Sequence, residues 1–315
     1  MDQTASVGSV LLPACFFGLY LILEAADWGL CMAGIWAART REERQTVLRL
    51  MRPALDGNEL WFFMALFMMV TVFPEMKQGT DALWYGAASF IVAAGAVLRM
   101  AGALLPERLD RVWFFRLLAV LSLGGMFLMG MIGTVLVRPD GQILSAAGAA
   151  GGGWAVLACF QIGTLYGAVK ASNPLGERCR AAFLVSSCAG VAIYLIFALL
   201  MRMDLGSEWG SAYFWMCLVA TAIFFTLSFV LVRKRKTSSG LAAGYAASFF
   251  AVFIYFSAYV TMIPQIYEPD VQVLRDSMDH TPGAFLLGTA LVWTAASFVW
   301  RQLRKRVVYE WKDHI

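Results

Sequence analysis

Few ionisable residues fall within the apolar stretches of this sequence, and these are the residues whose chemistry needs explaining. Glu24 and Asp27 lie in the first apolar stretch, and Arg99 lies in the third. A charged side chain is costly inside a bilayer and usually marks a functional position. Glu24 and Asp27 are three residues apart, so a helix places both carboxyls on one face. Two neighbouring carboxyls in a low dielectric cannot both ionise cheaply, so we expect at least one to hold its proton near neutral pH.

Two interpretations of this pair fit its spacing equally well. A proton relay needs a carboxyl that takes up and releases a proton at the working pH. A structural clasp would instead join the carboxyls to a neighbouring helix by hydrogen bonds, or to Arg99 by an ion pair. The spacing alone does not separate relay from clasp.

A second polar segment opens the next apolar stretch. Asp56 is placed as the N-cap of a helix, and Glu59 falls at its third position, which together predict a capping box. Trp61 follows, where an aromatic belt at the membrane surface is expected. Capping explains Asp56 without further function, yet a carboxyl at this position is also placed to pass protons towards Asp27.

Histidine, the commonest haem ligand, is nearly absent. The only two are His280 and His314, and both lie outside the apolar stretches. Bis-histidine haem ligation within a bundle is therefore excluded, and we expect this chain to bind no haem by itself. The six cysteines form no C-x-x-C pair, so neither a metal site nor a disulfide framework is indicated. His280 lies in an acidic segment where a solvated loop is favoured over a metal site.

Composition indicates that lipid is the solvent of this chain. Hydrophobic residues make up 60% of the 315 residues and charged residues 15%, whereas soluble domains carry about 25% charged residues. No long basic or acidic tail is present, which argues against nucleic-acid binding. We predict an all-α polytopic membrane bundle forming a single transmembrane domain over residues 1–315. The stretch Gly148–Gly153 is expected to be a small-residue surface for close helix packing.

Windows of about 20 apolar residues predict the membrane spans. There are nine of them, at residues 9–37, 59–74, 82–105, 113–137, 143–169, 181–201, 211–232, 240–264 and 283–300. Lys and Arg residues alternate strictly between the two sides: 20 lie on one side, four on the other, and Arg99 within a span. The positive-inside rule then places the N-terminus outside and the C-terminus in the cytoplasm.

Several of these motifs resemble subunit II of the cytochrome bd quinol oxidases. The most specific is Asp56-Gly57-Asn58-Glu59-Leu60-Trp61, which in the family reads Trp-Asp-Gly-Asn-(Glu/Gln)-Val-Trp. The family's first-helix Asp-Gly-Phe-Asp-x-Gly is here Glu24-Ala25-Ala26-Asp27-Trp28-Gly29. Residues 163–170, Gly-Thr-Leu-Tyr-Gly-Ala-Val-Lys, are similar to the family's Gly-Ala-Tyr-Leu segment. Leu55, Glu24, Ala25 and Ala26 depart from the family pattern and indicate a divergent branch.

The resemblance implies a function for the chain as part of a complex. The complex oxidises quinol, reduces oxygen to water and lies in the bacterial inner membrane. The larger partner subunit carries two b-type haems and one d-type haem. This chain then has no catalytic residue and no metal, and its only cofactor would be a structural quinone. The family's proton-path acids map onto Asp56, Asp27 and Glu24, with Gly57, Asn58, Glu59, Trp61 and Gly29 as supporting motif residues.

Further partners implied by the resemblance are quinol, membrane lipids and small single-helix subunits. Two other functions are weighed against it. A proton-coupled secondary transporter would use Glu24 and Asp27 as a coupling site, but it would need an internal repeat that the sequence does not show. A haem-free anchor subunit of another quinone-linked respiratory complex agrees with the substitutions around Glu24 and is disfavoured by the Asp56–Glu59 motif.

Overall fold

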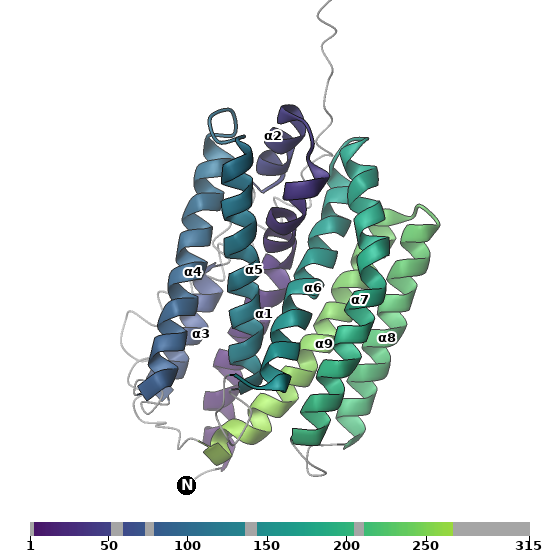
Figure 1. Cartoon of the computed structure of the whole chain (residues 1–315). Helices are drawn as coiled ribbons and strands as arrows, with labels where there is room; N and C mark the ends of the chain where they lie inside the picture. The colour runs from purple at the N-terminus through teal and green to yellow at the C-terminus, as the bar shows by residue number, and fades with distance from the viewer. Residues whose placement is uncertain (1–2, 52–58, 73–78, 136–143, 205–210, 267–315) are drawn as a thin grey trace, which may run out of the picture.

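Long apolar runs with few charged residues become helices here, because a helix satisfies every internal backbone group without water. The computed structural model describes residues 3–51, 59–72, 79–135, 144–204 and 211–266 (Figure 1). Within those ranges the chain forms helices and no strand. The helices are α1 (Gln3–Ala37), α2 (Arg41–Leu50), α3 (Glu59–Val72), α4 (Gly79–Leu104), α5 (Val112–Val135), α6 (Ala146–Lys170), α7 (Leu175–Asp204), α8 (Ser211–Arg233) and α9 (Thr237–Ile266).

Eight of the nine predicted spans coincide with helices in the described residues. The largest differences in bounds are at the starts of α1 and α7, which begin at Gln3 and Leu175 where the sequence predicts residues 9 and 181. Five helices within the described ranges are long and apolar enough to cross a membrane: Cys15–Ala37, Val112–Thr134, Ala146–Lys170, Leu175–Met203 and Phe214–Arg233. The predicted span at 283–300 lies outside the described residues.

Helix α2 lies where the sequence predicts only a basic loop. It begins with a capping box, in which the Thr40 hydroxyl accepts from the Glu43 amide at 3.2 Å and the Glu43 carboxylate accepts from the Thr40 amide at 3.1 Å. One face of this short helix packs against the bundle, because its apolar residues Val47, Leu48 and Leu50 are buried. At 10 residues it is too short to cross a bilayer.

Helix α6 is the centre of the bundle and packs against α1, α5, α7 and α9. Its contact with α1 is made by two glycines. A Cβ on Gly163 would lie 2.2 Å from the carbonyl carbon of Gly29, and one on Gly29 would lie 1.9 Å from the carbonyl oxygen of Cys159. The two backbones therefore touch, which small residues at a helix interface permit.

The glycine-rich start of α6 packs closely against α5, as the sequence predicts. A Cβ on Gly152 would lie 2.8 Å from the Phe127 side chain, and Gly130 approaches the carbonyl oxygen of Gly151 in the same way. In Figure 1 α2 lies at the opposite end of the bundle from the N-terminus.

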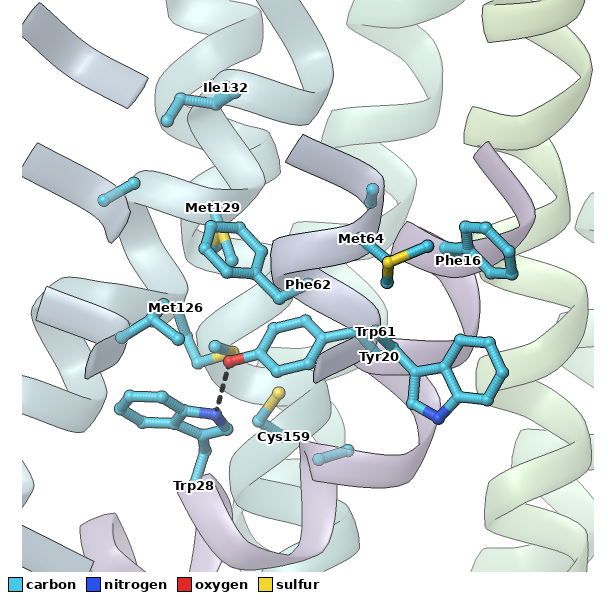
Figure 2. Packing of buried hydrophobic residues seen from close by; sticks show 14 of the residues in the cluster. Phe16, Tyr20, Trp28, Trp61, Phe62, Met64, Met126, Met129, Ile132 and Cys159 are labelled. Carbon is cyan, nitrogen blue, oxygen red and sulfur yellow. Dashed lines mark hydrogen bonds between the residues drawn. The ribbon is translucent and has the colours of Figure 1, made fainter. Parts of the chain in front are cut away.

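Aromatic and methionine side chains fill the space between α1, α3 and α5 (Figure 2). Trp61 is 2% exposed and its ring lies 5.2 Å from that of Phe16. The sequence predicts that Trp61 belongs to an aromatic belt at the membrane surface. The buried ring shows that this prediction is wrong. The ring packs inside the bundle because α3 presents it to the apolar face of α1.

Candidate functional site

The two carboxyls of α1 both face the interior of the bundle. Glu24 is 0% exposed and Asp27 is 2% exposed. Their spacing of three residues gives them nearly the same direction on the helix, as expected. Both acids of α1 are therefore held away from water, and the two residues between them in the sequence, Ala25 and Ala26, are buried as well.

Arg99 of α4 supplies a counter-charge for one of these acids. Its Nη1 lies 2.8 Å from Oε2 of Glu24, and the two side chains are only 2% and 1% exposed. An isolated charge at such a depth would cost several kcal/mol, and a close opposite charge offsets that cost. Of the two interpretations left open by the sequence, the clasp is therefore the one that the geometry favours for Glu24.

The ring of Trp28 lies against the Arg99 guanidinium. Its Cζ lies 4.3 Å from the centroid of the Trp28 ring, a distance at which the ring face attracts a cation. The Trp28 indole N–H donates a hydrogen bond of 3.1 Å to the Tyr20 hydroxyl, shown dashed in Figure 2. Gly95 of α4 makes room for the indole, because a Cβ there would lie 2.6 Å from the Trp28 ring. These contacts fix where Arg99 meets Glu24.

The ion pair is a contact of charges rather than a well-directed hydrogen bond. Neither carboxylate oxygen of Glu24 has a hydrogen-bond partner among the described residues. One guanidinium can balance one carboxylate, and the Arg99 guanidinium is the counter-charge that lies against Glu24. Spacing within α1 does not say which helix lies opposite, so the sequence left the relay and clasp interpretations open.

A second charged cluster lies at the end of the bundle that holds α2. The Asp110 carboxylate, in the loop before α5, accepts from Arg41 Nε at 2.5 Å and from Gln45 Nε2 at 2.8 Å. The Asp110 carbonyl accepts from Arg44 Nε at 2.6 Å. Burial alone would raise the pKa of Asp110, but the hydrogen bonds from Arg41 and Gln45 outweigh it and lower that pKa. The cluster joins α2 to the α4–α5 loop.

Glu43 of α2 is joined in the same way to the start of α7. Its carboxylate pairs with the Arg178 guanidinium, whose Nε also donates to the Ala37 carbonyl at 2.7 Å. Burial opposes ionisation of Glu43, yet the Thr40 amide and Arg178 together lower its pKa. Sequence reasoning missed this cluster, although Thr40-Arg41-Glu42-Glu43 carries the spacing of a capping box.

Part of the predicted site lies outside the described residues. This holds for Asp56, Gly57 and Asn58. Glu59 is the first residue of α3, and nothing is described of its side chain. Of the predicted supporting residues, Gly29 forms the backbone contact with α6 and Trp61 is a core residue. The structure brings Glu24, Asp27 and Arg99 together and leaves the Asp56 segment untested.

Two comparisons with known proteins, one of sequence and one of structure, found similar proteins. The family model described as cytochrome bd terminal oxidase subunit II matches residues 7–300. Among solved structures, a chain in the structure of bd oxidase from Geobacillus thermodenitrificans is similar, with a TM-score of 0.66 and 14% sequence identity. That alignment covers 95% of this chain and 97% of the other. No curated protein matches the sequence. At 14% identity the structural likeness shows a shared fold alone.

Proposed function

This chain belongs to the cytochrome bd terminal oxidase subunit II family, and we propose that it is the haem-free second subunit of a quinol:oxygen oxidoreductase. The observation that carries the proposal is the extent of the family match, residues 7–300. It includes both segments whose motifs resemble the family, around Glu24 and around Asp56. The helical bundle agrees with it, since all described elements are helices.

The haems of this complex belong to the partner subunit. This chain has only two histidines, at positions 280 and 314, and neither falls in a predicted span. Two b-type haems and one d-type haem in the larger subunit would supply the oxygen chemistry. This chain would complete the membrane complex, help to feed protons to it and retain the structural quinone that the family resemblance implies. Quinol, membrane lipids and small single-helix subunits complete the set of partners.

The orientation in the membrane follows from where the basic residues gather. Four connections between helices lie at the end of the bundle that holds α2 (Figure 1): α1–α2, α4–α5, α6–α7 and α8–α9. Basic residues at these places include Arg39, Arg108, Lys170 and Lys234. The positive-inside rule makes this end cytoplasmic in a bacterial inner membrane and supports nine spans with the N-terminus outside.

The proposed proton path begins at this cytoplasmic end. Asp56 lies in the segment before α3, and Asp27 is buried in α1, near the Glu24–Arg99 pair. In this scheme Asp56 and Asp27 take up and release protons. Glu24, whose carboxylate lies 2.8 Å from the Arg99 guanidinium, is the third acid of this path. The buried position of both α1 acids supports a place for them on the path.

Purification through a tag on this chain tests the proposed function. We expect the larger subunit to copurify and the reduced-minus-oxidised spectrum of the complex to contain a d-type haem band. The chain expressed without its partner should show no Soret band, because it offers no pair of histidines inside its spans. A stoichiometric haem in the isolated chain, or a complex without d-type haem, would overturn the proposal.

A further inference from the structure

Helix α2 covers the end of α1 that leads to the two buried acids. Met51, the C-cap residue of α2, is buried, and its sulfur accepts a hydrogen bond of 3.2 Å from the buried Cys31 thiol of α1. Cys31 is four residues beyond Asp27, which is about 6 Å along the axis of a helix. The end of α2 therefore touches α1 about one turn away from Asp27.

Apolar side chains close this end of the bundle around α2. A Cβ on Gly34 of α1 would lie 3.0 Å from the Phe115 ring and 3.3 Å from Val47. A Cβ on Gly102 of α4 would lie 2.8 Å from Leu48. The two glycines thus allow α2 and α5 to pack tightly against α1 and α4. The buried apolar cluster at this level includes Leu30, Cys31, Leu48, Met51, Phe114 and Leu118.

Polar residues of α2 hold this apolar face in place from two sides. Asp110 of the α4–α5 loop accepts from Arg41 at 2.5 Å and from Gln45 at 2.8 Å. Glu43 pairs with Arg178 of α7. An isolated helix of 10 residues is marginal in water. The position of α2 therefore depends on these polar contacts together with its apolar packing.

An apolar layer of this kind is a barrier to water. Apolar cavities stay dry, whereas a proton moves along polar groups or chains of water. The buried hydroxyls near this level, Ser122 and Thr46, donate to carbonyls of their own helices at 2.7 and 2.9 Å, so neither donates into the layer. Arg99 lies three residues from Gly102, about 4.5 Å along α4, on the inner side of the layer.

We propose that α2, with its buried residues Val47, Leu48 and Met51, is a plug over Asp27 and Arg99. The plug keeps water at the α2 end of the bundle from reaching the buried charges along α1. It follows from the packing of this chain alone. Its consequence for protons rests on the proposed function: protons bound for the α1 acids must pass beside α2 and not straight through it.

Thiol modification of Cys31 in the purified complex, held in lipid nanodiscs, tests the plug. The probe is a small charged methanethiosulfonate, which reacts in water and not in lipid, and mass spectrometry follows the Cys31 peptide. Met51→Ala removes the side chain that covers the thiol. Glu43→Gln is an independent test, because Gln keeps the capping box and loses the charge that pairs with Arg178.

We expect Cys31 to react at least roughly tenfold faster in both variants than in the wild type, because each variant uncovers the thiol more often. Met216→Ala and Glu42→Gln are the matched controls and should react like the wild type. Met216 is 57% exposed on α8, and Glu42 is exposed on α2 beside Glu43. Equal rates in the wild type and both plug variants would overturn the proposal, whether or not the complex consumes oxygen.

Quinol-driven oxygen uptake tests the consequence for protons. Asp56→Asn should slow uptake if Asp56 lies on the path beside α2. Adding Met51→Ala should then raise uptake again, because water passes the opened plug and reaches Asp27. A double variant with a reactive Cys31 and no gain in uptake would overturn the path beside α2. Wild-type uptake in Asp56→Asn alone would count against the proposed proton path and not against the plug.

Discussion

Burying Glu24 and Arg99 removes both side chains from water, and the 2.8 Å contact between them offsets that loss. Replacing such a pair with apolar residues is often harmless, whereas removing one member leaves the other charged and unpaired. The position of Arg99 over the Trp28 ring, and the hydrogen bond from Trp28 to Tyr20, hold the pair in one geometry. At this scale the structure shows the ion pair that the clasp interpretation of Glu24 requires.

Replacing Arg99 alone should destabilise the protein more than replacing both members of the pair. Arg99→Gln leaves Glu24 without its counterion, at a cost of about 3–5 kcal/mol. Glu24→Gln/Arg99→Gln removes both charges and should recover most of that loss. Melting temperatures of the purified complex measure the difference. If Arg99→Gln melts like the wild type, the pair does not hold the bundle as described.

Asp27 and Asp56 should affect turnover more than stability. Asp27→Asn and Asp56→Asn keep shape but cannot exchange a proton, so quinol-driven oxygen uptake per assembled complex should fall roughly tenfold or more. Asn and Ser cap a helix about as well as Asp, so a purely capping Asp56 would tolerate both Asp56→Asn and Asp56→Ser. Glu24→Gln should reduce the rate less. Wild-type rates in both Asp→Asn variants would leave these acids a structural role only.

Long helices were predictable from the sequence, whereas short helices and contacts between helices were not. A long apolar run such as 113–137, in which Arg116 is the one charged residue, leaves the backbone no alternative to a helix in a membrane, and α5 follows it closely. Helix α2 was missed because its short amphipathic sequence depends on contacts with Asp110 and Arg178 for its place. Glu24, Asp27 and Arg99 were identified from the sequence as candidate functional residues. Which acid pairs with Arg99 was not predictable, because that depends on how α1 and α4 pack.

The α1–α6 contact predicts a strong effect of a single methyl group. Gly163→Ala places a Cβ 2.2 Å from the Gly29 carbonyl carbon, so the helices must separate. Overpacking of this kind costs about 1–3 kcal/mol or more. Gly124→Ala is the matched control, because a Cβ on Gly124 in α5 meets nothing within 4 Å. The yield and melting temperature of the complex should fall for Gly163→Ala and hold for Gly124→Ala; the same result in both variants would contradict the contact.

The attachment of α2 should weaken in acid. The pKa of Asp110 is lowered in the folded protein, because hydrogen bonds from Arg41 and Gln45 outweigh burial. A lowered pKa means that Asp110 contributes its full stability above its unfolded value of about 3.9 and loses it as the pH falls through the lower folded value. Melting temperatures between about pH 2.5 and 6 measure this. Asp110→Asn should remove this part of the pH dependence, and an unchanged profile would count against the cluster.

At the scale of the whole molecule, polar chemistry is concentrated at two levels of an apolar bundle. The ion pairs of Asp110 and Glu43 lie at the end that holds α2, together with the basic junctions between helices. The α1 acids and Arg99 lie deeper, between α1 and α4. Exposed apolar side chains such as Phe90 and Val185 cover the outside of the described bundle, as expected for contact with lipid or a membrane partner. This arrangement agrees with the proposed role of the chain as a membrane subunit that helps to feed protons to a haem-carrying partner.

Quinol-dependent oxygen uptake by the complex purified through a tag on this chain tests the central claim most directly. The account predicts that the complex consumes oxygen when a quinol is supplied, and that the partner purified without this chain is inactive or unstable. Restoring the wild-type chain should restore the rate. A stable complex that contains this chain and consumes no oxygen with any quinol tested would contradict the assignment.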